Sequence, residues 1–259
     1  MSDLAAMAPA IRQAIDDIGY SIVDDAVAAD EIAAVRDFWL ATFAACKTQA
    51  PVIWTPYFGE PNRVLYHRHR DACLYRSYDY LWNEPIHGPT RDLGIRLNRV
   101  RNRVVEADER YGETLAADRY AVYVTTSYYP SGDGRMTEHC DRTDGRRHWH
   151  FILPLTFKGA DYASGGLVLT DRRGKRIDVD GRMRPGSVIF YDGTLPHAVE
   201  KIGVAPGMTQ GRLQMFAIPT FIDLPETSDR LAERIPVGRY AKDRLRPFKR
   251  RLMRLLRRE

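Results

Sequence analysis

The spacing of apolar residues changes near residue 119, and this change limits the folds open to the chain. Before it, residues 4–17, 29–46 and 91–109 carry apolar side chains at helical spacing, and residues 19–23 resemble a short strand. After it, apolar residues alternate over short segments separated by Gly, Pro and Asp turns. The segments predicted as strands are 120–129, 151–157, 166–170, 176–179, 188–191 and 212–218. Helices followed by six or more short strands predict a mainly β protein with α, in which an antiparallel sandwich or small barrel lies behind an N-terminal helical layer.

Length and composition fit one globular domain with a sizeable core. The chain has 259 residues, of which 44% are hydrophobic and 28% charged, and this balance excludes collagen, a coiled-coil rod and wholesale disorder. No run reaches the roughly 18 apolar residues of a membrane-spanning helix. Because residues 1–3 open no secretion signal and the three cysteines form no close pair, we expect a cytoplasmic protein with reduced thiols. Residues 47–88 are rich in aromatics, Pro and His without clean periodicity, and we predict loops there.

The positive charge is concentrated near the C-terminal end. Residues 239–259 contain ten Lys and Arg and two acidic residues, a net charge of +8, whereas the remaining residues carry −3. The acidic body argues against a nucleic-acid partner. We predict one domain over residues 1–225, with its β core at about 119–222, followed by a basic extension over 226–259. An amphipathic helix within this extension either lies on an anionic membrane surface, at the inner face of the membrane, or docks on the domain.

The motif His139-Cys140-Asp141 is the first candidate for chemistry. On a strand, positions i and i+2 point the same way, so His139 and Asp141 can present an imidazole and a carboxylate to one point. They offer two of the three ligands of a facial 2-His-1-carboxylate iron site. Fifty-six residues after Asp141, a buried strand and a turn lead to His197. Arg212 then opens a strand among apolar residues, where an Arg needs an anion such as a dicarboxylate.

The order His-x-Asp, a long β-rich interval, His, then Arg resembles the 2-oxoglutarate- and iron(II)-dependent dioxygenases. The segment 129–141 contains a Tyr-Pro and Gly-rich turn ten residues before the first His, and is similar to the prolyl-hydroxylase-like branch; the phytanoyl-CoA-hydroxylase-like branch is the alternative. The resemblance covers the core at about 119–222. It implies a double-stranded β-helix, the jelly-roll or cupin-like fold.

The resemblance also implies roles for individual residues. His139, Asp141 and His197 are the implied iron ligands. Arg212 is the implied partner of the distal carboxylate of 2-oxoglutarate, and Tyr129 is similar to the Tyr that lines the co-substrate pocket. One departure is that many members carry Ser two residues after the Arg, where this chain has Gln214. Its amide can still donate to a carboxylate.

The implied cofactor is Fe(II), with 2-oxoglutarate and O2 as co-substrates. The family hydroxylates unactivated C–H bonds and releases succinate and CO2; the expected substrate is a small molecule, a glycan or glycolipid, or an amino-acid residue. Related halogenases lack the carboxylate ligand, so Asp141 favours hydroxylation, although desaturation and ring formation use the same triad. Two alternatives stay open: a cupin-type metal-dependent isomerase or lyase that does not use 2-oxoglutarate, and a non-enzymatic, membrane-tethered β-sandwich binding module. The oligomeric state is not predicted.

Four residues are candidates for contact with the substrate. Tyr66, His67 and Trp82 lie in the segment predicted as loops, and loops before the core commonly form the pocket wall in this family. Trp149 either lines the active site or packs in the core. His148 and His150 are also two residues apart, but His139 and Asp141 already supply a ligand pair just upstream, so we do not expect them to bind the metal.

Overall fold

The structure is a computed structural model that describes residues 4–50, 57–115, 120–141, 147–208 and 210–222. Most of them belong to one compact unit, Met1–Val52 and Glu60–Phe221. The predicted basic extension, 226–259, lies outside the described residues, so its helix and its membrane contact stay predictions. In the part of the chain that is described, no helix has both the length and the apolar character needed to cross a bilayer.

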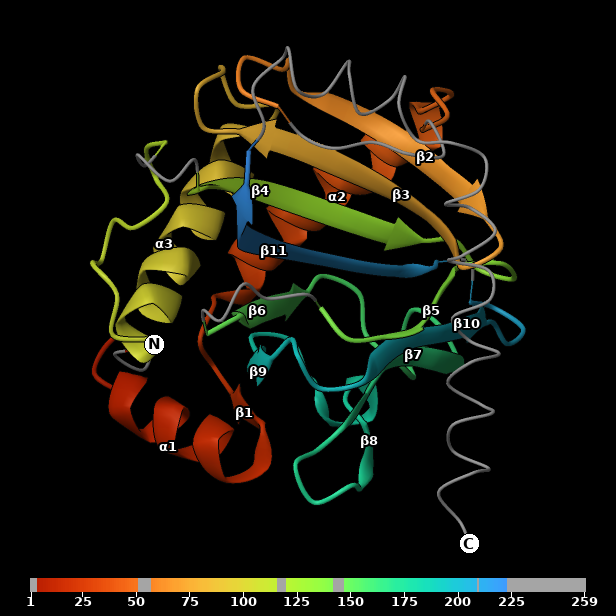
Figure 1. Cartoon of the computed structure of the whole chain (residues 1–259). Coiled ribbons are helices and arrows are strands. Elements are labelled where there is room, and N and C mark those ends of the chain that lie inside the picture. Colours follow the sequence, from red (N-terminus) through yellow and green to blue (C-terminus); the bar gives the residue numbers. More distant parts are fainter. Residues whose placement is uncertain (1–3, 51–56, 116–119, 142–146, 209, 223–259) are drawn as a thin grey trace, which may run out of the picture. The chain divides into compact units, whose positions relative to one another are not determined.

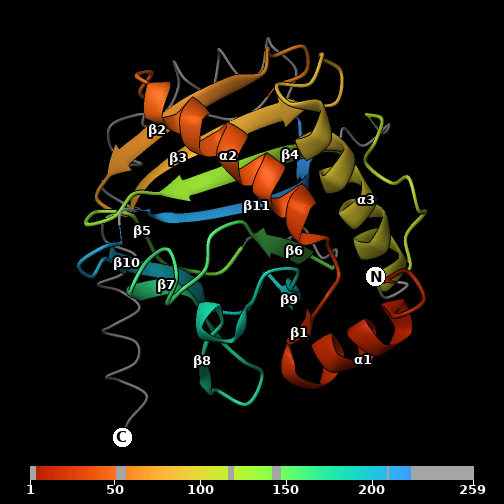
Figure 2. The ribbon, with the colours of Figure 1, turned by 180° about the vertical axis from the view of Figure 1, so that it is seen from behind.

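The helical layer predicted from the sequence is present. The described residues form the α-helices α1 (Ala8–Ile18), α2 (Ala29–Ala45) and α3 (Gly88–Val104), and a short 3-10 helix, η1 (Asp180–Arg182). α1 ends at Gly19, whose φ of 94° lets its N–H return to the Ile15 carbonyl. α2 and α3 cover one face of the sheet that contains β4 and β11 (Figure 2), whereas α1 packs against β1 and α3.

The remaining elements are strands. They are β1 (Tyr20–Val23), β2 (Arg63–His69), β3 (Ala72–Tyr80), β4 (Tyr120–Tyr129), β5 (Arg135–His139), β6 (Trp149–Pro154), β7 (Ser164–Thr170), β8 (Arg176–Asp178), β9 (Val188–Asp192), β10 (His197–Gly203) and β11 (Arg212–Phe221). From β4 onward the strands form two layers, ordered β9-β6-β11-β4 and β5-β10-β7-β8 (Figure 1). The chain crosses between them after each strand except β7, which pairs with β8 in the same layer. This arrangement is the double-stranded β-helix, and the predicted fold class is confirmed.

The prediction of loops over residues 47–88 is wrong for much of that segment. β2 and β3 form an antiparallel hairpin in which His69 pairs with Ala72, and β3 continues the sheet beside β4. The turn consists of Arg70 and Asp71, so it lacks the Gly or Asn that marks a tight hairpin in a sequence. β3 also pairs with β5. The hairpin therefore lies beside the strand that carries the His-x-Asp motif.

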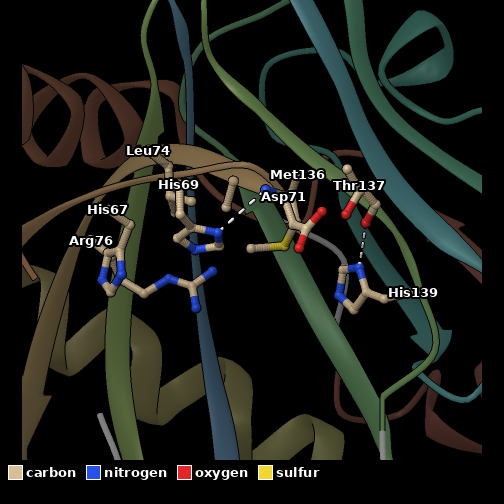
Figure 3. A pocket seen from close by; sticks show the side chains of 9 residues that line it. His67, His69, Asp71, Leu74, Arg76, Met136, Thr137 and His139 are labelled. Carbon is tan, nitrogen blue, oxygen red and sulfur yellow. Dashed lines mark hydrogen bonds between the residues drawn. The ribbon is translucent and has the colours of Figure 1, made fainter. Parts of the chain in front are cut away.

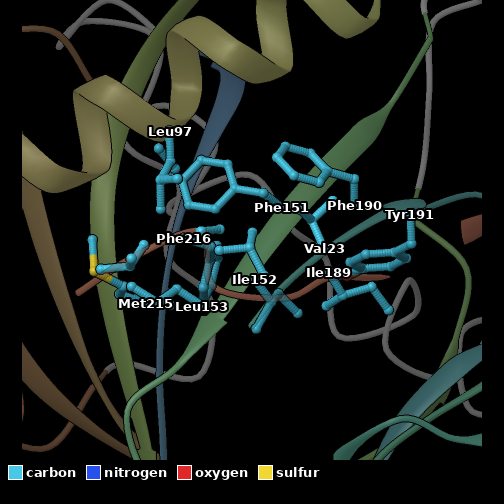
Figure 4. Close-up of a cluster of buried hydrophobic side chains, with 14 of the residues drawn as sticks. Val23, Leu97, Phe151, Ile152, Leu153, Ile189, Phe190, Tyr191, Met215 and Phe216 are labelled. Atoms are coloured by element: carbon cyan, nitrogen blue, oxygen red, sulfur yellow. The ribbon is translucent and has the colours of Figure 1, made fainter. Parts of the chain in front are cut away.

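Apolar side chains from β6, β9 and β11 form the core beneath α3 (Figure 4). Phe151, Leu153, Ile189, Phe190 and Met215 are each at most 1% exposed. Burying one such side chain stabilises a fold by about 1.5–3 kcal/mol. This packing fixes the strands that support the site.

Gly94 allows α3 to approach β4 closely. A Cβ added there would lie 2.7 and 2.9 Å from two methyl carbons of Val124, inside the roughly 3.5–4 Å of a normal carbon contact. Glycine to alanine in a helix normally stabilises by about 1 kcal/mol. Here we expect Gly94→Ala to lower the free energy of unfolding by about 1–3 kcal/mol, measured by urea denaturation. In a Val124→Ala background the same change should be neutral or stabilising; stabilisation in the unaltered chain would contradict this packing.

Candidate metal centre

The two predicted iron-binding histidines face each other across a strand pair. His139 is the last residue of β5, His197 is the first residue of β10, and they are direct partners in the antiparallel ladder. Nδ1 of His139 lies 2.8 Å from the Thr137 carbonyl oxygen, and Nδ1 of His197 lies 2.9 Å from that of Leu195. Because each Nδ1–H donates to a carbonyl, Nε2 of each ring keeps its lone pair for a metal.

Asp141 follows β5 and is the third member of the group. Its backbone N–H donates to the Gly193 carbonyl at 2.8 Å. Its Oδ1 lies 3.8 Å from Nε2 of His139, and its Oδ2 lies 3.7 Å from Nε2 of His197. Two metal–ligand bonds of roughly 2.1 Å span up to about 4.2 Å, so one ion can reach all three side chains. The structure thus brings the predicted ligands together, and this donor set fits ferrous iron.

The electrostatics favour the protonation states that bind a metal. Burial raises the pKa of the Asp141 carboxyl, but the hydrogen bond from His150 and the charges of His150, His197 and His139 outweigh it and hold that pKa well below its usual range. Burial lowers the pKa of His197, although Asp141 opposes this effect. At neutral pH the site therefore presents a carboxylate and a neutral imidazole, the forms that coordinate cations.

A second group of metal-ligand types also contains Asp141. The side chains of Asp141, His148 and His150 lie within 4.8 Å of one another. However, Nε2 of His150 is 2.8 Å from Oδ2 of Asp141, the distance of a direct hydrogen bond. Nδ1 of His150 is buried without a partner among the described residues, so no backbone carbonyl orients this ring. We therefore assign His150 to holding the Asp141 carboxylate rather than to binding the metal.

Gly193 leaves the space in which this support forms. A Cβ added to Gly193 would lie 2.4 Å from Nε2 of His150 and 2.7 Å from Oδ2 of Asp141. Both distances are too short for a carbon atom, so a side chain here would displace the carboxylate or the imidazole. The close approach of the backbone requires glycine at this position.

Two cavities meet at the candidate ligands. The inner cavity has a volume of about 130 Å³ and is lined by all three ligands together with Tyr129, Gln214 and Arg76. The outer cavity has a volume of about 430 Å³ and is lined by residues of β2, β3 and β5, among them His67 and His139 (Figure 3). Tyr129 and Gln214, predicted to bind 2-oxoglutarate, thus lie in the same small cavity as the ligands. Their hydrogen-bonding groups fit a small anionic molecule placed there.

Arg212 is not among the described residues that line either cavity. It is 1% exposed, and its Nε and Nη2 donate to the two oxygens of Asp180 at 2.5 and 3.0 Å. Its Nη1 donates to Oε1 of Gln214. The anion expected beside this buried guanidinium is thus a carboxylate of the chain itself, and contact of Arg212 with 2-oxoglutarate stays a prediction.

The four candidate substrate residues lie in different environments. His67 lines the outer cavity. Tyr66 stacks on Tyr75 with ring centroids 4.4 Å apart, and Nε1 of Trp82 donates to a backbone carbonyl. Trp149 is 4% exposed and belongs to the core cluster. Of the four, His67 alone is among the described lining residues of the two cavities, and substrate contact by all four stays a prediction.

The sequence did not indicate the roles of two residues of the site, although His150 stood out as half of a His-x-His pair. Arg76 lies in the middle of β3, within the segment predicted as loops, and His150 lies on β6, within the predicted β core. The alternation of Leu74, Arg76 and Tyr78 is the signal that could have placed Arg76 on a strand face. His150 and Asp141 are nine residues apart, and the backbone of Gly193 bonds both to Asp141 and to His148, next to His150 in the strand segment. No local pattern indicates this contact.

Comparison with known proteins places this geometry in a wider context. No family model matches the chain, and no curated protein matches it. A prolyl-4-hydroxylase from Pseudomonas putida has a TM-score of 0.56 at 17% identity, covering 83% of this chain and 99% of that one. SnoN, an α-ketoglutarate-dependent epimerase of nogalamycin biosynthesis, has a TM-score of 0.56 at 12% identity, with 83% and 84% covered. A Neurospora crassa protein in complex with α-ketoglutarate and 5-formyluracil has a TM-score of 0.53 at 14% identity, with 83% and 79% covered.

The chain has the fold of the 2-oxoglutarate- and iron(II)-dependent oxygenases. In this oxygenase fold the predicted ligands occupy the ends of two paired strands, β5 and β10, and the inner cavity lies between the two layers.

Asp141 belongs to two groups of candidate ligands, one with His139 and His197 and one with His148 and His150. Substitutions that weaken metal binding differ between the two groups. We expect one Mn(II) per chain by isothermal titration calorimetry, with affinity weakened on the order of a hundredfold or more in Asp141→Ala and in His139→Ala. Asp133→Ala, which removes an exposed carboxylate on the preceding turn, controls for loss of charge. Loss of binding in His148→Ala with retention in His139→Ala would assign the ion to the other group.

Substitution of Gly193 tests whether the Asp141 carboxylate depends on its contact with His150. We expect Gly193→Ala to weaken Mn(II) binding about tenfold, because the added methyl group displaces the Asp141 carboxylate. The added His150→Ala change removes the imidazole that the methyl group meets, so it should reduce the effect of Gly193→Ala. Unchanged metal affinity in Gly193→Ala would show that the carboxylate does not depend on this contact.

Proposed function

We propose that the chain is an Fe(II)- and 2-oxoglutarate-dependent oxygenase. It hydroxylates an unactivated C–H bond of a small molecule, a glycan or glycolipid, or an amino-acid residue, and it releases succinate and CO2. The observation that carries this proposal is the convergence of His139, Asp141 and His197 on one point that opens into a cavity. The shared fold of known 2-oxoglutarate-dependent enzymes supports it.

The residues of the site would have separate roles in holding and orienting the metal. Two imidazoles and one carboxylate hold the ion and leave three coordination positions free. When bound, iron and 2-oxoglutarate supply, with O2, an oxidant able to attack a C–H bond. The hydrogen bonds from His139 and His197 to backbone carbonyls fix the direction of each Nε2 lone pair. His150 holds one oxygen of Asp141, so the carboxylate enters coordination already oriented.

The surroundings of the inner cavity keep water away from the reaction. Ile152, Leu167 and Phe216 line it beside the ligands, and Phe216 is 5% exposed. Exclusion of water protects reactive species and strengthens electrostatic contacts. The larger outer cavity shares His139 with the inner one, and a substrate placed there would lie next to the metal.

The activity can be tested before the substrate is known. Protein loaded with Fe(II) in the absence of oxygen, then exposed to air with 2-oxoglutarate, should form succinate slowly, and the rate should rise with fractions of cell extract that contain the substrate. We expect succinate formation to need Fe(II) and to be lost in His139→Ala. His87→Ala removes an imidazole at the N-terminus of α3 and controls for general effects. Gain of one oxygen in the product, by mass spectrometry, distinguishes hydroxylation from epimerisation.

If iron-loaded protein never consumes 2-oxoglutarate under these conditions, the proposal fails. A metal-dependent reaction that proceeds without 2-oxoglutarate would instead support the cupin-type isomerase or lyase. Absence of any metal binding would support the non-enzymatic binding module.

A further inference from the structure

Arg76 is a positively charged side chain shared by the two cavities. It lines the inner cavity together with the candidate ligands and also lines the outer cavity. Figure 3 shows it reaching from β3 toward the side of the pocket that holds Met136 and His139. It is partly buried, and arginine stays protonated in proteins, so it carries its charge into this space.

No carboxylate among the described residues forms an ion pair with Arg76. Its Nε donates to Oγ of Ser127 at 3.0 Å, and its guanidinium carbon lies 5.5 Å from the centre of the Phe216 ring. The side chains of Tyr78 and Tyr129 also form hydrogen bonds with Arg76. All of these partners are uncharged groups. A guanidinium withdrawn from bulk water is unfavourable unless it meets an anion, so this position is completed by a negatively charged ligand.

Unlike Arg76, Arg212 forms an ion pair with a carboxylate of the chain, that of Asp180. The carboxylate of Asp180 receives two hydrogen bonds from Arg212, one from the Tyr162 hydroxyl at 2.6 Å and one from the Leu167 N–H at 2.8 Å. The charges of Arg212 and Asp180 therefore cancel within a buried, fully hydrogen-bonded pair. Such a pair has little charge left to attract a ligand, and breaking it would leave a buried carboxylate without its partner.

The sheet register places a hydrogen-bond donor beside Arg76. Arg76 pairs with Ser127 across β3 and β4, and Ser127 pairs with Gln214 across β4 and β11. Side chains at paired positions point to the same face, so the three form one polar row. Oε1 of Gln214 accepts from Arg212, which leaves its NH2 group to donate. Gln214 lines the inner cavity with Arg76, and a carboxylate there can be bound by both.

We propose that Arg76, together with Gln214, binds the distal carboxylate of 2-oxoglutarate, while Arg212 and Asp180 form a buried pair that stabilises the fold. This inference rests on the proposed function, because it assumes a dicarboxylate in the inner cavity. It moves the cationic contact from the first residue of β11 to β3, which lies on the other side of β4 in the sheet. Arg76 also borders the outer cavity, so the co-substrate and the substrate would meet at this side chain.

The test compares two ligands that differ in one group. 2-Oxoglutarate and 2-oxopentanoate share the chelating 2-oxo acid, but the second has a methyl group in place of the distal carboxylate. Both are titrated by calorimetry into the full-length, Mn(II)-loaded protein without oxygen, so the readout is equilibrium binding. The preference for 2-oxoglutarate over 2-oxopentanoate should fall about tenfold or more in Arg76→Gln. Arg76→Lys, which keeps the charge, should retain part of it and serves if Arg76→Gln does not fold.

The matched control replaces the buried ion pair as a unit. In Arg212→Gln with Asp180→Asn, an amide pair takes the place of the two charges, and we expect the preference for 2-oxoglutarate to persist. Preference retained in the Arg76 variants but lost in this control would overturn the inference and assign the contact to Arg212. If the unaltered protein binds neither acid in the presence of Mn(II), the proposed function itself fails, and this outcome is distinct from the first.

Discussion

The pairing of β5 with β10 is the constraint on which the site depends. In this ladder His139 stands opposite His197, although the two lie far apart in the chain. Side chains alternate between the two faces of a strand, so a shift of one residue would turn one imidazole away from the other. The hydrogen bond from the Asp141 N–H to the Gly193 carbonyl then fixes the carboxylate beside the pair. The pairing of β5 with β10 thus brings His139 and Asp141, two residues apart in the sequence, to the distant His197.

The charges near this ladder are arranged in complementary pairs. Arg212 and Asp180 neutralise each other in the interior. Asp141 is stabilised as a carboxylate by the histidines around it, and Arg76 carries a positive charge without a described carboxylate beside it. In the proposed complex, a metal cation lies beside the Asp141 carboxylate, and the distal carboxylate of the dicarboxylate lies beside the Arg76 guanidinium. Each bound group then lowers the electrostatic cost of binding the other, because opposite charges attract more strongly where water is excluded.

The sequence predicted the core well because its signals are local. The short runs of β-branched and aromatic residues over 120–129 and 188–191, and the turns that bound them, are such signals, and the structure has buried strands there. The hairpin of β2 and β3 was not predicted, because its turn of Arg70 and Asp71 lacks the usual turn residues. The three candidate ligands were predicted from the His-x-Asp motif and the family resemblance, and the structure places their side chains close together. The contact of His150 with Asp141 depends on Gly193, whose backbone bonds to both segments. The position of Arg76 depends on the pairing of β3 with β4. No local pattern encodes either contact.

The position of the bound metal tests most directly whether His139, Asp141 and His197 hold one ion together. Crystals of the protein grown with Fe(II) in the absence of oxygen, measured at the iron absorption edge, would locate the ion by its anomalous signal. We expect one peak at roughly 2.1 Å from Nε2 of His139, from Nε2 of His197 and from an oxygen of Asp141. A peak between His148 and His150, or no peak near Asp141, would contradict it.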